Sequence, residues 1–563
     1  MTTSDDVSAA LDRLAAGSTR LVSSDPGFRA DLARRTALAI ADAADAWAAA
    51  AVAMKGGGGD AVLAQEIATG PLGTMRLALL HARAWLDVAR EGVPRAASAP
   101  RLLHAGKPVE GKSLVAIDVL PAAGPRGTLH DGTIYSGCSV TVRCHDPGGL
   151  EAFARSWRRE AADRPREGGV AVVLGAGNVT GLGAADVLAQ VFEHGRGALL
   201  KLHPVQASLA EPLGRALAPL AAEGLVAIVA GGPETARAAI AAPAATHVHL
   251  TGGRGAFDAI VWGGPVPAAA GARPRLEKPV TCELGNVTPW FVVPGRYSPA
   301  ALAFQADQIA ASIVNNGSFN CIATKLVVTA RAWPQREEFL AMVRRRLASL
   351  PARTAWYPGS TAAWEEASGR KAPADGTLPW VLAEGVDPGR DPRVERECFV
   401  PVACEAALEG ADVATYCRRA AEVVHRLPGS LAASVTLPAG LSAAERHAAE
   451  NLVDHLPFGV VAVNCWSAIA YAVGNVPWGG FPGATLADPR SGIGFVHDPL
   501  LLPLVHNSIL RGPLLPSLRP AWFPWHRSGA MLARGVVDLY RRRAEGREGW
   551  TTLLGMLPAV IRG

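Results

Sequence analysis

A regular alternation of short apolar runs and helical segments between Gly168 and Leu250 places the strongest constraint on the fold. Short links between alternating strands and helices require right-handed crossovers, which bury a parallel sheet between layers of helices. The architecture is that of nucleotide-binding domains, although architecture alone does not establish function. Strands are predicted at Val170–Leu174, Ala198–Leu202, Leu225–Ala230 and His247–Leu250, and helices at Ala184–His194, Leu209–Ala222 and Pro233–Ala241.

Regular structure is predicted on both sides of this alternation. Up to about residue 110 the chain is Ala-rich with a helical period, which four glycines at 56–59 interrupt. A second α/β region begins near Val280. The further helices predicted are Ala30–Met54, Gly70–Ala89, Gly149–Ala162, Pro299–Val314, Pro334–Leu350 and Ser442–His455, and the further strands are Ser113–Leu120, Gly132–Cys144, Val280–Leu284, Trp290–Val293 and Gly459–Asn464.

Composition places the chain among soluble globular proteins with more than one structural unit. It has 563 residues, of which 49% are apolar and 19% charged. The eight cysteines form no C-x-x-C pair and no Cys/His cluster, which favours a reducing compartment and no metal site. The N-terminus lacks the apolar stretch of a signal peptide, and no uncharged apolar run reaches the ~18 residues of a membrane span. We therefore expect a cytoplasmic protein.

A cysteine lies where a predicted helix leads into a predicted strand. Cys321 belongs to the stretch Asn315–Lys325 (NNGSFNCIATK) and precedes the β-branched run at 326–329. A lone cysteine beside a strand is most often core filler. The alternative is a nucleophile, because a small-residue turn entering a strand can hold a thiol at the edge of the core, where its thiolate can meet a substrate.

The first strand of the alternation runs into a glycine-rich turn, Gly175-Ala-Gly177-Asn178-Val-Thr-Gly181. Such a turn can hold a pyrophosphate at a helix N-terminus. Its spacing is G-x-G-x-x-x-G, and the next strand ends in Lys201 instead of an acid, which argues against the ordinary dinucleotide fingerprint. Asn178 has another role open to it, since an amide N–H₂ at a strand end can donate to a developing oxyanion.

Glu283, in Cys282-Glu283-Leu284-Gly285-Asn286, places a carboxylate at the end of another predicted strand. A solvated surface acid is the ordinary interpretation of such a residue. The alternative is a general base, because a candidate thiol follows downstream in the same region.

Together these residues resemble the motifs of the aldehyde dehydrogenase superfamily, and the resemblance covers about residues 30–510. Cys321-Ile-Ala-Thr-Lys325 is similar to the family's nucleophile loop, and Glu283-Leu-Gly to its general-base motif. The 23 residues from Asn178 to Lys201 match the family's separation between its oxyanion asparagine and its cofactor-binding lysine.

Two later segments extend the resemblance. Glu397-Cys-Phe399-Val-Pro401 resembles the family's E-x-F-x-P motif, whose glutamate holds the nicotinamide ribose. Pro477-Trp-Gly-Gly-Phe481, followed by Ser491-Gly-Ile-Gly494, is similar to its late glycine-rich segment. Five motifs in the family's order are far more specific than any one of them.

The resemblance implies an α/β fold of the aldehyde dehydrogenase type. Its parts would be a parallel-sheet dinucleotide-binding domain, an α/β catalytic domain and a small oligomerisation β element. The expected divisions are an N-terminal helical part of the cofactor domain (1–110), oligomerisation strands (111–148), the dinucleotide-binding domain (149–278), the catalytic domain (279–458), a return to the cofactor and oligomerisation region (459–503) and a basic C-terminal extension (504–563).

The resemblance also implies an activity, namely oxidation of an aldehyde to a carboxylic acid with NAD or NADP, through a cysteine thiohemiacetal and thioester. The protein would be a homodimer or homotetramer with a small-molecule aldehyde as substrate and no nucleic-acid partner. The catalytic residues implied are Cys321, Glu283 and Asn178, and the cofactor-binding residues are Lys201, Gly252, Gly253, Glu397 and Phe399.

Several departures from the family pattern keep alternatives open. The loop Gly317-Ser-Phe-Asn-Cys321 is one residue longer than the family's, so that an ungapped comparison puts Asn320 at the nucleophile position. The family's second cofactor glycine falls on Phe257. Lys201-Leu-His-Pro204 lacks the usual acid, which leaves NADP as acceptable as NAD, and it resembles CoA-acylating relatives. A CoA-acylating dehydrogenase or acyl-CoA reductase, and a non-catalytic binding scaffold, are the two rivals.

The tail lies beyond the resemblance. From Leu504 to Gly563 the chain holds nine arginines, no lysine and three acids, so only this part is basic. It contains an aromatic–basic cluster at 520–527, a segment Met531–Arg543 in which apolar residues are interspersed with arginines, and an uncharged apolar segment Trp550–Ile561. One interpretation is packing on its own or a neighbouring subunit. The other is peripheral contact with a membrane, because Trp and Arg beside an apolar helix suit a membrane surface.

Overall fold

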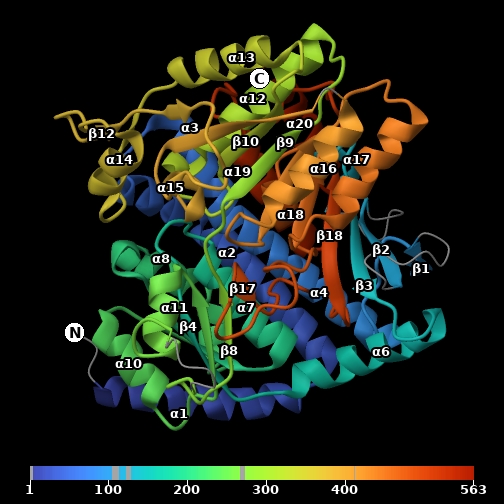
Figure 1. Ribbon diagram of the computed structural model, residues 1–563. Helices are drawn as coiled ribbons and strands as arrows, with labels where there is room; N and C mark the ends of the chain where they lie inside the picture. Colours follow the sequence, from blue (N-terminus) through green and yellow to red (C-terminus); the bar gives the residue numbers. More distant parts are fainter. Residues whose placement is uncertain (1–3, 104–112, 122–128, 267–272, 411) are drawn as a thin grey trace.

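Two large β-sheets organise the fold (Figure 1). Residues that follow or end strands of the lower sheet contact the loop that carries Cys321. The computed structural model describes residues 4–103, 113–121, 129–266, 273–410 and 412–563. The sheet in the lower half of Figure 1 arises from the alternating region of the sequence, and the sheet in the upper half from the second α/β region. The α/β fold class expected from the sequence is confirmed.

The lower sheet has six strands in the order β17-β8-β7-β4-β5-β6. All neighbours pair in parallel except β17, which runs antiparallel to β8. Strand β4 lies between β5 and β7, so the chain adds strands first on one side of β4 and then on the other. In open α/β sheets this arrangement forms a ligand crevice at the C-terminal ends of the strands. The strands are β4 (Val170–Leu174), β5 (Gly197–Lys201), β6 (Val226–Val229), β7 (His247–Thr251), β8 (Val280–Glu283) and β17 (Gly492–Ile493).

The upper sheet has ten strands in the order β1-β2-β3-β18-β16-β15-β9-β10-β14-β13. The pairings from β1 to β18 are antiparallel and those from β18 to β13 are parallel. The strands are β1 (Arg101–Leu102), β2 (Leu114–Leu120), β3 (Ser139–His145), β9 (Thr288–Val292), β10 (Thr324–Ala330), β13 (Val381–Ala383), β14 (Val402–Leu408), β15 (Ala432–Thr436), β16 (Val460–Val463) and β18 (Val505–Arg511). Strands β11 (Arg353–Thr354) and β12 (Thr377–Leu378) form a separate pair.

Helices cover both faces of the lower sheet: α1, α10 and α11 pack on one face, and α2, α4, α7 and α8 on the other. By length and composition alone α2 could cross a membrane; its residues Leu32, Ile40 and Trp47 are buried where it packs against α4 and α8. The helices of this half are α1 (Ser4–Val22), α2 (Pro26–Met54), α3 (Gly59–Ile67), the π-helical turn η1 (Ala68–Leu72), α4 (Gly73–Glu91), α5 (Asp131–Ile134), α6 (Leu150–Asp163), α7 (Leu182–His194), α8 (Ala210–Ala216), α9 (Ala218–Ala222), α10 (Pro233–Ala241) and α11 (Arg254–Val261).

Helix α12 delivers the chain to the Cys321 loop. Its N-terminus is capped by Ser298, whose hydroxyl accepts from the N–H of Ala301 at 3.2 Å, and Pro299 occupies the first turn. It runs into the 3₁₀ turn η5 (Asn315–Ser318). The helices of the upper half are α12 (Pro299–Val314), α13 (Arg336–Ala348), α14 (Ser360–Ser368), α15 (Pro392–Glu395), α16 (Val413–Val424), α17 (Ala443–His455) and α18 (Ala468–Val473).

Two predicted segments differ from the structure in kind. The segment Gly132–Cys144, predicted as a strand, begins with the end of the short helix α5, and β3 starts only at Ser139. The predicted helix Leu209–Ala222 is broken into η4 (Pro204–Leu209), α8 and α9, because Leu217 has non-helical dihedrals just ahead of Pro219, which falls in the first turn of α9.

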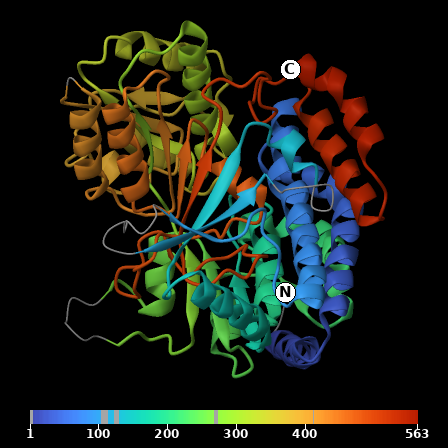
Figure 2. The ribbon, with the colours of Figure 1, turned by 90° about the vertical axis from the view of Figure 1, so that its right-hand side faces the viewer.

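Two expected divisions of the chain also shift. Strand β8 falls at the start of the expected catalytic domain, but it pairs with β7 in the lower sheet. Strand β18, placed in the C-terminal extension, lies inside the upper sheet between β3 and β16. The appended part therefore begins after Arg511. It folds as α19 (Gly529–Ala544) and α20 (Trp550–Ile561), which lie along the outside of the N-terminal helices (Figure 2).

Candidate active site

The Cys321 thiol faces the Glu283 carboxylate across the junction of the two sheets. Cys321 Sγ lies 3.5 Å from Glu283 Oε1, so that the thiol can donate to the carboxylate. Glu283 ends β8, while Cys321 precedes β10 and is half-buried. The two candidate catalytic residues are thus brought together from different sheets.

The electrostatics of this pair follow from its burial. Burial, reinforced by the charge of Asp186, raises the pKa of Glu283 to about 8. Trp478 opposes that shift, because its indole N–H donates to Glu283 Oε2 at 3.0 Å. Burial, together with Glu283, raises the pKa of the Cys321 thiol well above its ordinary value. The cysteine is therefore a thiol whose proton Glu283 is placed to receive.

Asn178 lies beside the nucleophile loop, at the end of β4. Its side-chain Nδ2 donates to the Phe319 carbonyl at 3.1 Å, which uses one of its two hydrogens. The loop itself is unusual, because Asn316, Gly317 and Ser318 all have left-handed backbone dihedrals with φ of 54°, 65° and 67°. Two non-glycine residues in this region cost free energy and need contacts that hold them.

Asn316 provides those contacts. Its amide Nδ2 donates to the carbonyl of Asn178 at 2.9 Å and to that of Phe319 at 2.7 Å. Its Oδ1 accepts from Lys55 Nζ at 2.7 Å, and its backbone N–H donates to Gln65 Oε1 at 2.8 Å. Asn316 therefore ties the nucleophile loop both to the Asn178 turn and to the N-terminal helices.

Lys55 is the centre of a polar cluster beneath the loop that the sequence did not reveal. Lys55 and Glu66 are both fully buried and lie 2.7 Å apart. Lys55 ends α2 just before the glycine break, and nothing in its neighbourhood along the chain marks it as different from a surface lysine. Its role depends on Asn316, 261 positions away.

We expect Lys55→Met to lower the free energy of unfolding by roughly 3–5 kcal/mol, because it leaves the buried Glu66 carboxylate without its ion-pair partner. Lys55→Met with Glu66→Leu should recover most of that loss, since no unpaired charge remains. Urea unfolding of the three proteins measures both changes. If the single and double variants were equally destabilised, the effect would come from lost packing and not from the charge.

A second buried lysine holds the other side of the loop. Lys325 Nζ donates to the carbonyl of Ser318 at 2.9 Å, to its hydroxyl at 2.6 Å and to the carbonyl of Val400 at 3.0 Å. Burial lowers the pKa of Lys325 to about 8. This lysine links the nucleophile loop to the segment that contains Glu397.

Glu397 and Phe399 lie against the loop from the side of β14. Glu397 Oε2 packs on the backbone of Gly285, where any side chain would collide with it, and Glu397 Oε1 is buried with no partner among the described residues. Burial raises the pKa of Glu397 to about 7, and the Lys325 charge opposes this shift. The ring of Phe399 lies 6.2 Å from that of Phe319 and 5.2 Å from that of Tyr357.

The remaining candidate residues lie at the C-terminal edge of the lower sheet. Lys201 ends β5 and is mostly buried, which lowers its pKa, while Glu234 opposes that shift. Gly252 and Gly253 join β7 to α11, and the N–H of Gly252 donates to the Glu283 carbonyl at 3.0 Å. Gly253 is exposed at the N-terminus of α11. The arrangement presents a cation and a free helix N-terminus on one edge of the sheet.

The residues at which the sequence departs from the family pattern make defined contacts in the structure. Asn320 donates to Asn315 Oδ1 at 2.9 Å and accepts from the N–H of Ile322, so its amide is used in shaping the turn. Phe257 is fully buried in the core under α11. His203 packs on Gly177, where a side chain would meet its ring, and stacks at 6.2 Å on Tyr357.

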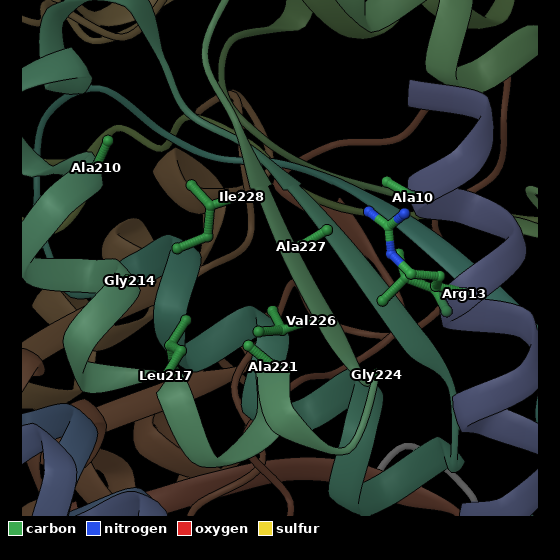
Figure 3. A pocket seen from close by; sticks show the side chains of 11 residues that line it. Ala10, Arg13, Ala210, Gly214, Leu217, Ala221, Gly224, Val226, Ala227 and Ile228 are labelled. Atoms are coloured by element: carbon green, nitrogen blue, oxygen red, sulfur yellow. The ribbon is translucent and has the colours of Figure 1, made fainter. Parts of the chain in front are cut away.

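A cavity of about 490 Å³ lies away from this site, between α1, α8, α9 and the edge strand β6 (Figure 3). Its lining is mostly apolar, with Arg13 at one side, and it contains none of the candidate catalytic or cofactor-binding residues.

Comparison with known proteins supports the fold. No protein-family model matches the sequence, and no curated protein matches it either. Solved structures match over about 90% of the chain. An NADP-dependent glyceraldehyde-3-phosphate dehydrogenase from Bacillus halodurans, complexed with NADP, has a TM-score of 0.59 and 15% identity and is covered over 91% of its length.

Two further matches come from other organisms. An NAD-dependent aldehyde dehydrogenase from Sinorhizobium meliloti has a TM-score of 0.57 and 14% identity and is covered over 86% of its length. A glyceraldehyde-3-phosphate dehydrogenase from Methanocaldococcus jannaschii, complexed with NADP, has a TM-score of 0.58 and 12% identity and is covered over 95%. The chain thus has the fold of the aldehyde dehydrogenases.

Proposed function

We propose that this protein oxidises an aldehyde to a carboxylic acid with NAD or NADP, using Cys321 as the nucleophile. The observation that carries the proposal is the 3.5 Å approach of Cys321 Sγ to Glu283 Oε1 at the junction of the two sheets. A thiol with a carboxylate in hydrogen-bond reach and an amide donor nearby is the arrangement that acyl chemistry needs.

The first step is attack of the Cys321 sulfur on the aldehyde carbon, as the thiol proton leaves toward Glu283. The negative charge that develops on the aldehyde oxygen needs donors, and Asn178 Nδ2 has a second hydrogen for it. The backbone N–H of Cys321 is the other donor available. The Asn316 contacts matter here, because they hold the Asn178 turn and the loop in one register.

The residues present suit a nicotinamide dinucleotide. Glu397 Oε1 is buried without a partner among the described residues, so a ribose hydroxyl can satisfy it. Lys201 and the exposed α11 N-terminus at Gly253 can hold the adenosine ribose and the pyrophosphate, and Phe399 borders the nicotinamide side. When bound, the dinucleotide supplies the acceptor for the hydride that leaves the thiohemiacetal.

Once the thioester has formed, Glu283 releases the thiol proton to solvent, and the free carboxylate then acts as the general base on the thioester. It takes a proton from water, the water oxygen bonds to the acyl carbon, and the bond to Cys321 sulfur breaks to release the acid. Cys321 recovers its proton in the same step.

An assay of reduced-nicotinamide absorbance over a panel of aldehydes, with NAD and NADP and with and without CoA, tests this function. Aldehyde-dependent reduction that needs no CoA is the expected result. Reduction that requires CoA and yields acyl-CoA would favour an acylating dehydrogenase instead. No reduction with any aldehyde would favour a binding scaffold.

We expect the turnover number to rise with pH through about 8, because Glu283 must be ionised to serve as base and its pKa is raised to about 8. Trp478→Phe should move this rise to higher pH, since the carboxylate loses its indole donor. Trp157→Phe is the matched control, because Trp157 is also a buried indole donor but bonds to the carbonyl of Leu500. A profile in Trp478→Phe that is unchanged would contradict the role of this bond.

We further propose that the protein is a cytoplasmic homodimer or homotetramer that associates through the antiparallel strands at the β1 side of the upper sheet. The support is that β1 is an edge strand of only two residues, so the antiparallel end of this sheet can be extended by a strand of a second copy. Light scattering combined with gel filtration gives the mass in solution, and a monomer at micromolar concentration would contradict the proposal.

A further inference from the structure

The C-terminal helices form a hairpin of which only the inner helix is integrated into the body. Helix α19 packs on α2 and α3 and buries Leu539 and Tyr540. The Tyr540 hydroxyl accepts from Arg76 at 2.7 Å, and Arg534 and Arg541 form ion pairs with Asp45 and Asp42 of α2. Helix α19 is therefore fixed in place, and it holds α20 on the outer surface (Figure 2).

Helix α20 presents a continuous apolar stripe to solvent. Its inner side packs closely, with Met556 seated over Gly535 of α19, where any side chain would collide with it. On its outer side Trp550, Leu554, Leu557 and Ile561 are 59%, 64%, 49% and 74% exposed. These positions follow the spacing i, i+4, i+7 and i+11, so they lie along one face of the helix.

The stripe belongs to a wider accumulation of exposed apolar side chains. Of the eleven large hydrophobic residues that are exposed in the described chain, seven lie between Leu515 and Ile561. They are the four residues of the stripe together with Leu515, Leu518 and Met531. An accumulation of exposed apolar side chains of this kind marks an interaction site.

The charge around the stripe is positive. No charged residue lies within Trp550–Ile561, and arginines flank it at 547 and 562. Residues 512–563 hold eight arginines against three acids, and each of these acids already forms an ion pair with an arginine of the same segment. Arg527 and Arg562 form no ion pair with an acidic side chain among the described residues, so their charge is available to an anionic partner.

We propose that α20 docks this protein on the surface of an anionic membrane, with the stripe at the boundary between headgroups and acyl chains. An apolar face with tryptophan at one end and arginines at both ends is the pattern of an interfacial helix. A second copy of the chain is the less favoured occupant, because the stripe spans about two heptads, and a stable coiled-coil seam takes about 3–4. The basic surplus also repels a second copy of the same surface but attracts anionic lipid.

Sedimentation with phosphatidylcholine vesicles, with and without phosphatidylserine, tests the proposal on the full chain. The wild-type protein should pellet with the serine-containing vesicles, and its partition coefficient should fall at least about tenfold when ionic strength rises several-fold, since headgroup attraction is screened. Leu554→Asp with Leu557→Asp should abolish binding at either salt concentration. Thr551→Asp is the matched control, because it adds charge at an exposed position of the same helix outside the stripe.

Each result has a defined consequence. Loss of binding in the double aspartate variant, with binding weakened only moderately in Thr551→Asp, supports the proposal. Recovery of the wild-type protein in the supernatant with both vesicle types overturns it, as does binding that the double variant retains. A concentration-dependent mass in solution that the double variant abolishes would assign the stripe to a second copy instead. The oxidation of a soluble aldehyde should be equal in all these proteins, so failure here is separate from failure of the proposed function.

Discussion

Cys321→Ala should reduce aldehyde oxidation by roughly 10⁴–10⁶-fold, because it removes the atom that forms the covalent bond with the substrate. Binding of NAD or NADP should stay the same, since the thiol contributes to bonding with the aldehyde and not to the sites around Lys201 and Glu397. Steady-state absorbance measures the first effect, and quenching of tryptophan fluorescence by the dinucleotide measures the second.

Cys282→Ala is the matched control for this variant. Cys282 is buried on β8, one residue from Glu283, and burial raises its pKa to about 12. Among the described residues, no carboxylate lies within hydrogen-bond distance of the Cys282 thiol to take its proton, in contrast to Cys321. The control should therefore keep most of its activity. If iodoacetamide labelled Cys282 and left Cys321 unmodified, the assignment of the nucleophile would be wrong.

Local pattern was enough to predict the elements of the lower sheet. The continuous run of Val, Ala and Leu at 170–174 is typical of a strand buried on both faces, and helix α10 begins at Pro233 as the sequence suggests. Local pattern does not predict which sheet a strand joins, because that depends on pairing with strands that are distant in the sequence. Strand β8 precedes β9 by only a few residues, yet they lie in different sheets.

The residues of the candidate site also fall into two groups, those that a local motif predicts and those that it does not. Cys321, Glu283 and Asn178 could be singled out because each stands in a short motif at a strand end, and the structure brings them to one junction. The residues that hold these three in place could not be singled out from the sequence, because their hydrogen-bond partners lie far away along the chain. Lys55 and Asn316 are 261 positions apart, and Trp478 bonds to a carboxylate 195 positions earlier. Their chemistry depends on burial and hydrogen bonding, which no local pattern of residues records.

In the proposed function, Glu283 favours water over CoA as the acceptor of the acyl group. Its carboxylate lies beside the sulfur, and burial raises its pKa to about 8, so it is placed to activate water, which transfer to CoA does not require.

Glu283→Gln keeps the shape of the side chain and an oxygen for the Trp478 indole but cannot accept a proton. We expect one equivalent of reduced dinucleotide in a burst, followed by steady-state turnover slowed roughly 10²–10⁴-fold. Intact-protein mass spectrometry should then find the acyl group on Cys321. Glu397→Gln is the contrasting variant, because it should weaken use of the dinucleotide without accumulation of acyl-enzyme. Loss of the burst itself in Glu283→Gln would show that the first step cannot proceed without the carboxylate as acceptor of the thiol proton. Rapid formation of acyl-CoA by the native protein would show that the acyl group is transferred to CoA.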